Sequence, residues 1–205
     1  SAMTQTRALL NGGGCVHEIT ADLSTTAPLQ GIVDETVARF GALHILVNNA
    51  GIIRRADSTD YTEADWDAVV DTNLKSLFFL SQAAGRHMIA RGSGKIVNVA
   101  SLLSLQGGIR VPAYTASKSG VAGLTRLLAC EWAAKGVQVN AIAPGYVATN
   151  NTAALQADEK RSAEILGRIP AGRWGRPEDI GGAAVFCQIF VSSVRVHRHL
   201  EIMRR

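Results

Sequence analysis

The chain has few cysteines and no long apolar run. Its 205 residues include three cysteines, Cys15, Cys130 and Cys187, and none of them belongs to a C-x-x-C pair. An odd number of widely spaced cysteines predicts buried thiols in a reducing compartment, and it argues against disulfides or a zinc site. No apolar stretch approaches the 18 residues typical of a transmembrane helix, although 47% of the residues are hydrophobic. We therefore expect a cytoplasmic protein without a membrane segment.

Strong charge and metal-ligand patterns are also absent. The net charge is only +4, and part of it comes from four arginines among the last eleven residues. A small positive charge that comes partly from the C-terminal residues does not predict a nucleic-acid-binding groove. The five histidines show no metal-ligand spacing, so we expect no metal site. A chain of this length forms one domain, 1–205, with a core of substantial size.

Apolar strand-like runs alternate with helix-like stretches along the chain, which predicts an α/β fold with a parallel sheet. Gly41 and Gly136 stand where helices should end, and Thr62 is placed to cap a helix whose first turn is acidic. The expected strands are Val16–Thr20, Leu43–Val47, Lys95–Val99 and Val137–Ala143. The expected helices are Thr26–Phe40, Thr62–Ala90, Ala113–Lys135 and Pro177–Phe186, with a separate lobe at Tyr146–Arg173.

The spacing of Tyr114 and Lys118 predicts a site of proton transfer. Residues four apart share one face of a helix, so an ammonium can lie beside a phenol. A nearby cation favours the phenolate and lowers the tyrosine pKa from its usual value near 10. Tyr114 is therefore a candidate general acid/base, and Ser101, thirteen residues upstream, could hydrogen-bond a substrate oxygen. Taken alone, the spacing occurs often by chance, and the alternative is a surface pair on an amphipathic helix.

Other motifs follow in order around this pair. Asn48-Asn-Ala-Gly51 ends the apolar run at 43–47, Asn73 lies in Asp71-Thr-Asn-Leu74, and Pro144-Gly145 ends the run at 137–143. With these motifs, the chain resembles the short-chain dehydrogenase/reductase family from about Thr20 to about Phe186. Further segments, among them Ala143-Pro-Gly-Tyr-Val-Ala-Thr149, are similar to a branch that acts on deoxy-sugar acids of the 2-deoxy-D-gluconate or 2-dehydro-3-deoxy-D-gluconate type.

The resemblance implies a Rossmann-like doubly wound sheet and an oxidoreductase. It makes Tyr114 the proton donor or acceptor, Lys118 its activator, Ser101 the group that orients the carbonyl, and Asn73 part of a proton relay. Substrate would contact Ser101 and the cations Arg54 and Arg110, with Arg55 as a further candidate, because a carboxylate suits a guanidinium. We expect NAD as cofactor, with NADP left open. The residues expected to bind it are Asp22, Asn48, Ala50, Gly51, Tyr114, Lys118, Pro144, Gly145, Val147 and Thr149.

The chain also departs from the family at both ends. No Gly-rich turn between a strand and a helix precedes Asp22, so we expect an incomplete fold without the first two strands and first helix. Residues 187–205 differ from the family's last strand, and we treat them as a divergent tail. Two alternatives follow: a catalytically silent remnant that binds no dinucleotide, or a dehydrogenase for another polyol or 3-oxoacyl substrate. The apolar helices at 62–90 and 113–135 predict a homodimer or homotetramer.

Overall fold

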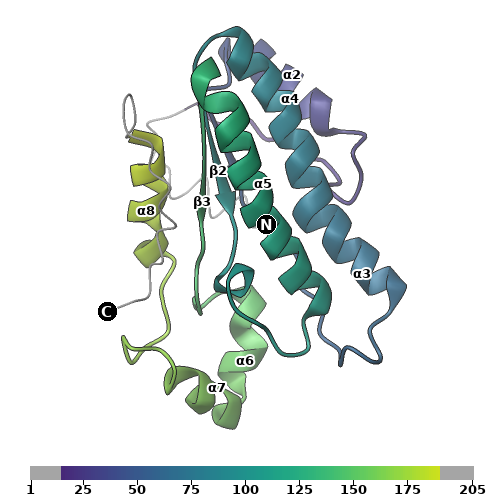
Figure 1. Ribbon diagram of the computed structural model, residues 1–205, viewed down its shortest axis with the longest axis vertical. Coiled ribbons are helices and arrows are strands. Elements are labelled where there is room, and N and C mark those ends of the chain that lie inside the picture. The colour runs from purple at the N-terminus through teal and green to yellow at the C-terminus, as the bar shows by residue number, and fades with distance from the viewer. Residues whose placement is uncertain (1–14, 190–205) are drawn as a thin grey trace.

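A parallel sheet of three strands forms the centre of the protein. The structure, a computed structural model, describes residues 15–189 (Figure 1). The strands are β1 (Ile45–Asn48), β2 (Gly94–Val99) and β3 (Val137–Ile142), which lie side by side in that order. In register, Val47 lies opposite Val97, and Val97 lies opposite Asn140. The predicted α/β class with a parallel sheet is confirmed for these residues.

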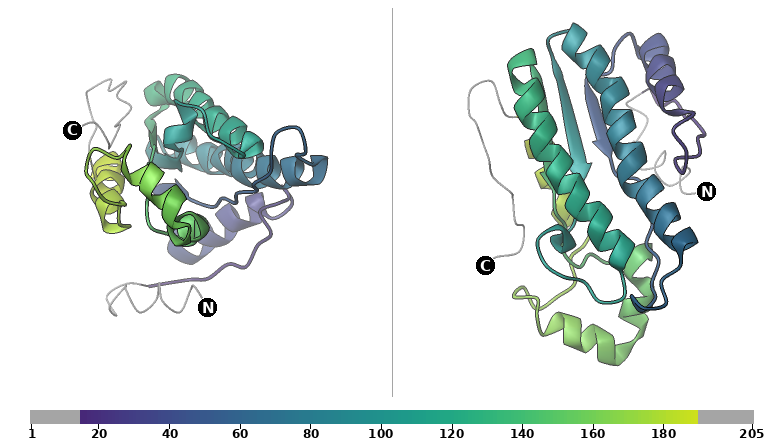
Figure 2. Two further views of the ribbon diagram at one scale, coloured as in Figure 1. Left: turned by 90° about the horizontal axis from the view of Figure 1, so that it is seen from below. Right: turned by 45° about the vertical axis from the view of Figure 1, so that its right-hand side comes forward.

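Helices cover both faces of this sheet. The long helices α4 (Ser76–Ala90) and α5 (Pro112–Trp132) run side by side over one face, with α2 (Leu29–Phe40) beside α4, and α8 (Glu178–Ile189) covers the other face (Figures 1 and 2). The main core lies between the sheet and α2, α4 and α5. Its buried members are Val33, Ala83, Ala84, Met88, Ile96, Leu128, Trp132, Val137 and Val139.

Local chemistry explains where several of these elements begin and end. The Thr62 side chain accepts a hydrogen bond from the Asp65 backbone N–H at the start of α3 (Glu63–Val70). Pro112 opens α5, where a missing N–H costs nothing. Gly41 ends α2 at a φ of 80°, and Gly136 follows the short 3₁₀ turn Ala133–Lys135 at a φ of 81°, a conformation that favours glycine.

The structure corrects three predicted elements. Residues 16–20 are not a strand, because no described strand lies beside them to supply hydrogen-bond partners. The predicted helix at 62–90 is divided into α3, a π-helical turn (Asp71–Lys75) and α4. The last helix continues beyond Phe186 to Ile189, so residues 187–189 belong to it, and the rest of the expected tail lies outside the described residues.

The predicted lobe after β3 is helical and sits below the sheet edge in Figure 1. It contains a 3₁₀ turn (Asn150–Thr152), α6 (Ala153–Ala157) and α7 (Glu159–Leu166). A single bridge between Val147 and Gly175 joins the two ends of the lobe. Within residues 15–189, no helix has the length and apolar character to cross a membrane.

Candidate active site

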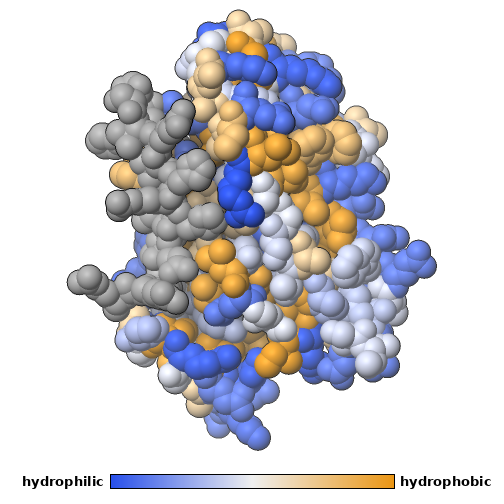
Figure 3. Space-filling model, in the orientation of Figure 1, coloured by the Kyte–Doolittle hydropathy of each residue, from blue (hydrophilic) through white to orange (hydrophobic). Residues whose placement is uncertain are grey.

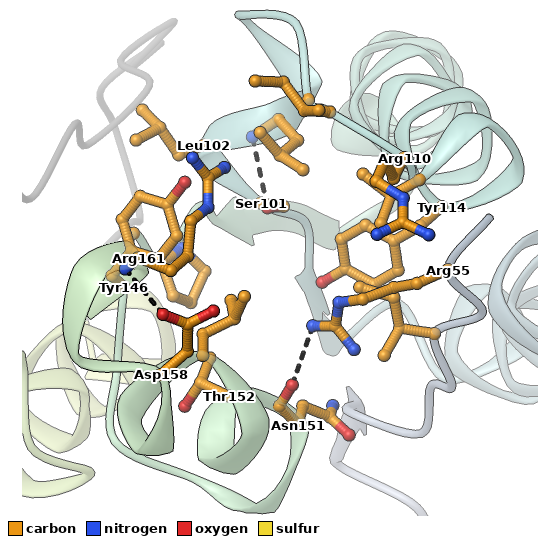
Figure 4. Close-up of a pocket in the computed structure, with 18 residues that line it drawn as sticks. Arg55, Ser101, Leu102, Arg110, Tyr114, Tyr146, Asn151, Thr152, Asp158 and Arg161 are labelled. Carbon is orange, nitrogen blue, oxygen red and sulfur yellow. Dashed lines mark hydrogen bonds between the residues drawn. The ribbon is translucent and has the colours of Figure 1, made fainter. Parts of the chain in front are cut away.

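The predicted site residues gather where the parallel strands end. Asn48 is the last residue of β1, Ser101 follows β2 by two residues, and Pro144 and Gly145 follow β3. In open α/β sheets, ligands bind at this carboxyl edge. A pocket of about 450 Å³ lies there, between the end of the sheet, the start of α5 and the helical lobe (Figure 4). Tyr114 and Ser101 both line it.

The helix α5 brings Tyr114 and Lys118 together as predicted. The Lys118 Nζ lies 5.7 Å from the centre of the Tyr114 ring and donates a hydrogen bond to the Val99 carbonyl oxygen at 2.6 Å. Lys118 is only 4% exposed, so its ammonium is held under the pocket rather than in solvent. The surface-pair alternative is therefore excluded for these two residues.

Burial controls the protonation of both groups. Desolvation lowers the pKa of Lys118 from 10.5 to about 8. It also raises the pKa of Tyr114, and this effect outweighs the opposing hydrogen bond with Ser101 and the positive charge of Arg55. The expected lowering of the Tyr114 pKa by Lys118 is thus not found in the free protein. The ammonium interacts with the Val99 carbonyl, and the phenol is buried more deeply than the sequence argument assumed.

Asn73 lies in the π-helical turn and is fully buried. Its side chain holds the chain after β1 in place: Oδ1 accepts from the Ile52 N–H at 2.8 Å, and Nδ2 donates to the Ile52 carbonyl at 2.9 Å. Nδ2 also lies 3.4 Å from the Ser117 hydroxyl, which donates to the Tyr114 carbonyl. π-Helical turns are frequent at functional sites, and this one connects Asn73 to the helix that carries Tyr114.

A buried network of polar side chains supports the strand ends. The Asn48 amide donates to Ser81 Oγ at 2.9 Å and to Asn98 Oδ1 at 2.8 Å, and Asn98 Nδ2 donates to Thr125 Oγ1 at 2.9 Å. The network joins β1 and β2 to α4 and α5. Only Asn48 was singled out from the sequence, because nothing in the local pattern shows that the other three side chains meet it.

The arginines divide into those inside and those outside the pocket. Arg55 and Arg110 line it, whereas Arg54 does not and instead pairs with Asp65, with 3.5 Å between Nε and Oδ1. Arg161 of α7 also lines the pocket, on the side facing Tyr114 (Figure 4). Arg161 could not be identified from the sequence, because only the folding of the lobe brings α7 over the strand ends.

Three of these four cations already have a carboxylate partner. Arg110 Nε lies 3.0 Å from Asp57, Arg161 Nη1 lies 2.9 Å from Glu164, and Arg54 pairs with Asp65. Arg55 has no carboxylate partner among the described residues; its Nη2 donates to the Asn151 carbonyl at 2.9 Å. Arg55 is therefore the pocket guanidinium whose charge is not already offset by a carboxylate among the described residues, and it keeps N–H donors for an anion.

The lobe contributes an aromatic and polar wall. Tyr146 lines the pocket and packs edge-on against Trp174, with 5.6 Å between ring centres. Thr149 caps the following 3₁₀ turn and shares hydrogen bonds with Thr152, whose hydroxyl also donates to the Val147 carbonyl. Val147 and Thr149 do not line the pocket. Their predicted contacts with the cofactor would therefore lie outside it.

Lys118 and Gly51, which lie beside the pocket but do not line it, fit a ribose. An ammonium has three donors, and Lys118 uses one of them on Val99, which leaves donors for the hydroxyls of a sugar. A Cβ at Gly51 would lie 3.3 Å from Asn73 Oδ1 and 3.7 Å from Lys118 Nζ, so a glycine keeps this space open. Ala50 precedes it in the same irregular segment after β1. For the adenine end, Asp22 is exposed, and its carboxylate accepts a hydrogen bond from the Ser24 N–H.

The described residues offer less for a pyrophosphate or a metal. No glycine-rich turn joins a strand to a helix N-terminus within residues 15–189. Gly12-Gly-Gly14 lies outside the described residues. Within the same range, no cluster of three or more histidine, cysteine or acidic side chains could hold a metal ion.

Comparison with known proteins identifies the family. Residues 2–160 match the short chain dehydrogenase family. The chain belongs to this family. It is 62% identical over 169 residues to 2-dehydro-3-deoxy-D-gluconate 5-dehydrogenase of Escherichia coli, and the match covers 82% of this chain and 67% of that protein. The Bacillus subtilis protein of the same name is 54% identical over 189 residues, with 91% of this chain and 73% of that protein covered.

A solved short-chain dehydrogenase shows the same architecture. The gluconate 5-dehydrogenase of Burkholderia cenocepacia, crystallised with NADP and tartrate, superposes with a TM-score of 0.85 at 40% identity. The superposition covers 90% of this chain and 72% of that one. The family resemblance and the Rossmann-like fold expected from the sequence are thereby confirmed.

Proposed function

We propose that the protein is an NAD(P)-dependent oxidoreductase that transfers a hydride between the cofactor and a secondary alcohol or ketone of a deoxy-sugar acid. The observation that carries this proposal is the Tyr114 phenol, which faces a cationic pocket beside Ser101 with the Lys118 ammonium buried beneath it. The relatives named as 2-dehydro-3-deoxy-D-gluconate 5-dehydrogenases support the substrate class. When bound, the nicotinamide supplies the hydride chemistry.

Proton transfer is the protein's part of the reaction. During oxidation, the Tyr114 phenolate accepts the proton of the substrate hydroxyl, while the Ser101 hydroxyl hydrogen-bonds the same oxygen. During reduction, the phenol returns that proton to the carbonyl oxygen. Because burial raises the pKa of Tyr114, the phenolate forms at alkaline pH, so we expect oxidation to be faster there and reduction to be faster near neutrality. Asn73 would complete the relay from Lys118 to solvent.

Charge in the pocket selects the substrate class. Arg55, Arg110 and Arg161 line it against a single acidic lining residue, Asp158, which favours an anionic ligand. We assign the carboxylate of the substrate to Arg55, because the other two cations are already paired. Arg54, one of the three arginines that the sequence suggested, lies outside the pocket and receives no such role.

The protein's dinucleotide is either NAD or NADP. We expected NAD from the sequence, whereas the Burkholderia cenocepacia enzyme was crystallised with NADP. The residues that fit the nicotinamide ribose, Gly51 and Lys118, do not distinguish the two. Calorimetric titration of the 205-residue chain with NAD⁺ and NADP⁺ decides between them, and an absence of binding to both would favour the silent-remnant alternative.

The test of the activity is Tyr114→Phe, assayed on a panel of sugar acids, polyols and 3-oxoacyl esters with NAD⁺, NADP⁺ and their reduced forms. Loss of the proton donor should lower kcat by at least about 10²–10⁴-fold, the usual contribution of general acid–base catalysis. Dinucleotide binding by Tyr114→Phe should stay close to that of the parent. Turnover within a few-fold of the parent would refute the role of Tyr114, and a preference for 3-oxoacyl esters would refute the substrate class.

We also infer that the enzyme works in the cytoplasm as a homodimer or homotetramer. Of the three thiols that we expected to be buried, only Cys187 is; Cys15 and Cys130 are exposed, and free thiols suit a reducing compartment. The helices α4 and α5 carry exposed apolar side chains, which suits an interface with a second copy.

A further inference from the structure

The Ser104 hydroxyl connects two parts of the site. It donates a hydrogen bond to the Lys118 carbonyl at 2.7 Å and accepts one from the Ser101 N–H at 3.2 Å. The first bond reaches α5, and the second closes a capping box around the 3₁₀ turn Leu102–Ser104. One half-buried side chain therefore joins the turn that follows β2 to the helix that carries Tyr114.

A second hydrogen bond joins α5 to the residues that precede Ser101 in the chain. Lys118 Nζ donates to the Val99 carbonyl, two residues before Ser101, and the Lys118 backbone accepts from Ser104, three residues after it. Ser101 is thus held between two attachments to the same residue. Tyr114 lies one turn before Lys118 on α5, so these attachments fix the distance between the Ser101 hydroxyl and the Tyr114 phenol.

We propose that Ser104 is a positioning residue, which holds the Ser101 hydroxyl against the Tyr114 phenol by joining the backbones of Ser101 and Lys118. This inference rests on the proposed function of the same site. The Ser104 hydroxyl acts both as donor and as acceptor, whereas alanine could neither donate to the Lys118 carbonyl nor accept from the Ser101 N–H. The Ser101 hydroxyl is itself engaged by the Leu103 N–H at 3.1 Å, so a shift of the turn moves it as well.

Displacement of Ser101 has a specific chemical consequence. The hydrogen bond between Ser101 and Tyr114 opposes the effect of burial and lowers the pKa of the phenol. When Ser101 is held less firmly, the phenol pKa should rise and the reacting oxygen should be less well oriented. Arg55 is not part of this connection, so the KM for the sugar acid should change little while kcat falls.

The experiment compares Ser104→Ala with Ser104→Thr, which retains the hydroxyl. Thr36→Ala is the matched control, because the Thr36 hydroxyl donates to a helix carbonyl, that of Ile32, at 2.7 Å in α2. The ionisation of Tyr114 is followed by NMR of ring-¹³C tyrosine in the full chain without ligands, with Tyr114→Phe providing the assignment. Steady-state kinetics with the best sugar acid give kcat and KM separately.

For Ser104→Ala we expect an upward shift of the Tyr114 pKa by about 0.5–1 unit, the effect of weakening one hydrogen bond. We also expect a fall of about 10-fold in kcat, since small displacements of a reacting group are costly. Ser104→Thr should restore both values, and Thr36→Ala should match the parent. If Ser104→Ala does not fold, Ser104→Cys replaces it, and its weak thiol donor should give a smaller shift in the same direction.

A folded Ser104→Ala or Ser104→Cys variant with the parent's Tyr114 pKa would overturn the proposal. So would failure of Ser104→Thr to restore the Tyr114 pKa. The NMR measurement needs no turnover, so it remains decisive even if the parent protein proves inactive on every substrate. In that case the proposed function fails, and the role of Ser104 in positioning Ser101 is judged from the phenol pKa alone.

Discussion

At the scale of single residues, two adjacent arginines have different roles. Arg55 lines the pocket with free donors, whereas Arg54 is paired with Asp65 outside it. We expect Arg55→Gln to raise the KM for a sugar acid by about 10–100-fold, the effect of losing a charge-assisted contact. Arg54→Gln, the matched control, should change that KM by less than about threefold. Steady-state kinetics of both variants, with a neutral polyol for comparison, measure this.

The pair of variants separates the two interpretations of the sequence. Equal losses for Arg54→Gln and Arg55→Gln would remove the distinction drawn between the two arginines. A loss for Arg54→Gln alone would restore the sequence-based assignment and remove ours. A loss of activity toward the neutral polyol would show that Arg55 acts on Tyr114 rather than on a carboxylate.

Lys118 makes the stability of the protein depend on pH. Burial lowers its pKa to about 8 in the folded protein, against 10.5 in the unfolded chain. Between these values the unfolded chain holds a proton that the folded protein has released, so stability from this group rises with pH there. Below pH 8 the folded protein carries the full cost of a buried charge. Lys118→Met should therefore stabilise the protein at pH 7 by about 1–3 kcal/mol.

Urea unfolding at pH 7, 8.5 and 10 measures this change. The gain from Lys118→Met should shrink as the pH approaches 10, because the parent has then lost its buried charge. The exposed Lys160→Met is the control and should show no such pH dependence. Destabilisation by Lys118→Met at pH 7 would mean that the hydrogen bond to Val99 outweighs the cost of burying the ammonium.

At the scale of elements, alanine should have opposite effects on stability at two helix glycines, because one lies in a tight contact between α4 and α5 and the other faces open space. A Cβ on Gly85 of α4 would lie 2.7 Å from the Trp132 ring, whereas one on Gly31 of α2 meets nothing within 4 Å. Gly85→Ala should destabilise the protein by about 1–3 kcal/mol through overpacking. Gly31→Ala should stabilise it by about 0.5–1 kcal/mol, because alanine is the better helix former. Thermal unfolding of both variants checks the prediction, and a destabilising Gly31→Ala would contradict it.

The helices and strands differ in how far the sequence could predict them. Helix α5 was predictable because its signals are local: Pro112 opens it, and Tyr114 and Lys118 share a face by spacing alone. The strand at 16–20 was predicted wrongly because its apolar pattern is local, whereas a strand exists only where a partner supplies hydrogen bonds. The π-helical turn at Asn73 was not predictable either. The Asn73 side chain in this turn binds the backbone of Ile52, which lies 21 residues away in sequence.

The candidate site divides in the same way. The proton-transfer residues could be named from spacing, since Tyr114 and Lys118 are on one helix and Ser101 is on the preceding strand–turn segment. Arg161 and Ser104 could not, because their positions depend on how the lobe and the 3₁₀ turn pack against α5. The direction in which the Tyr114 pKa shifts could not be predicted from the sequence either, because burial of the phenol decides it.

At the scale of the whole molecule, the face formed by α4 and α5 predicts self-association. Phe79 is 39% exposed and Leu127 is 47% exposed, and hydrophobic side chains gather along this face (Figure 3). Two copies related by a two-fold axis could bury both helices in an isologous interface. We expect an oligomer in light scattering at micromolar concentration, and we expect Leu127→Glu to shift it toward the monomer, because a carboxylate buried without a partner is costly.

The control must remove exposed apolar surface elsewhere. Phe40, at the end of α2, is 45% exposed and lies off this face, so Phe40→Glu should leave the oligomer intact. A parent protein that is monomeric at micromolar concentration would refute the interface. If Phe40→Glu dissociated the oligomer and Leu127→Glu did not, the contact would lie on the α2 side, and the exposed side chains of α4 and α5 would need another partner.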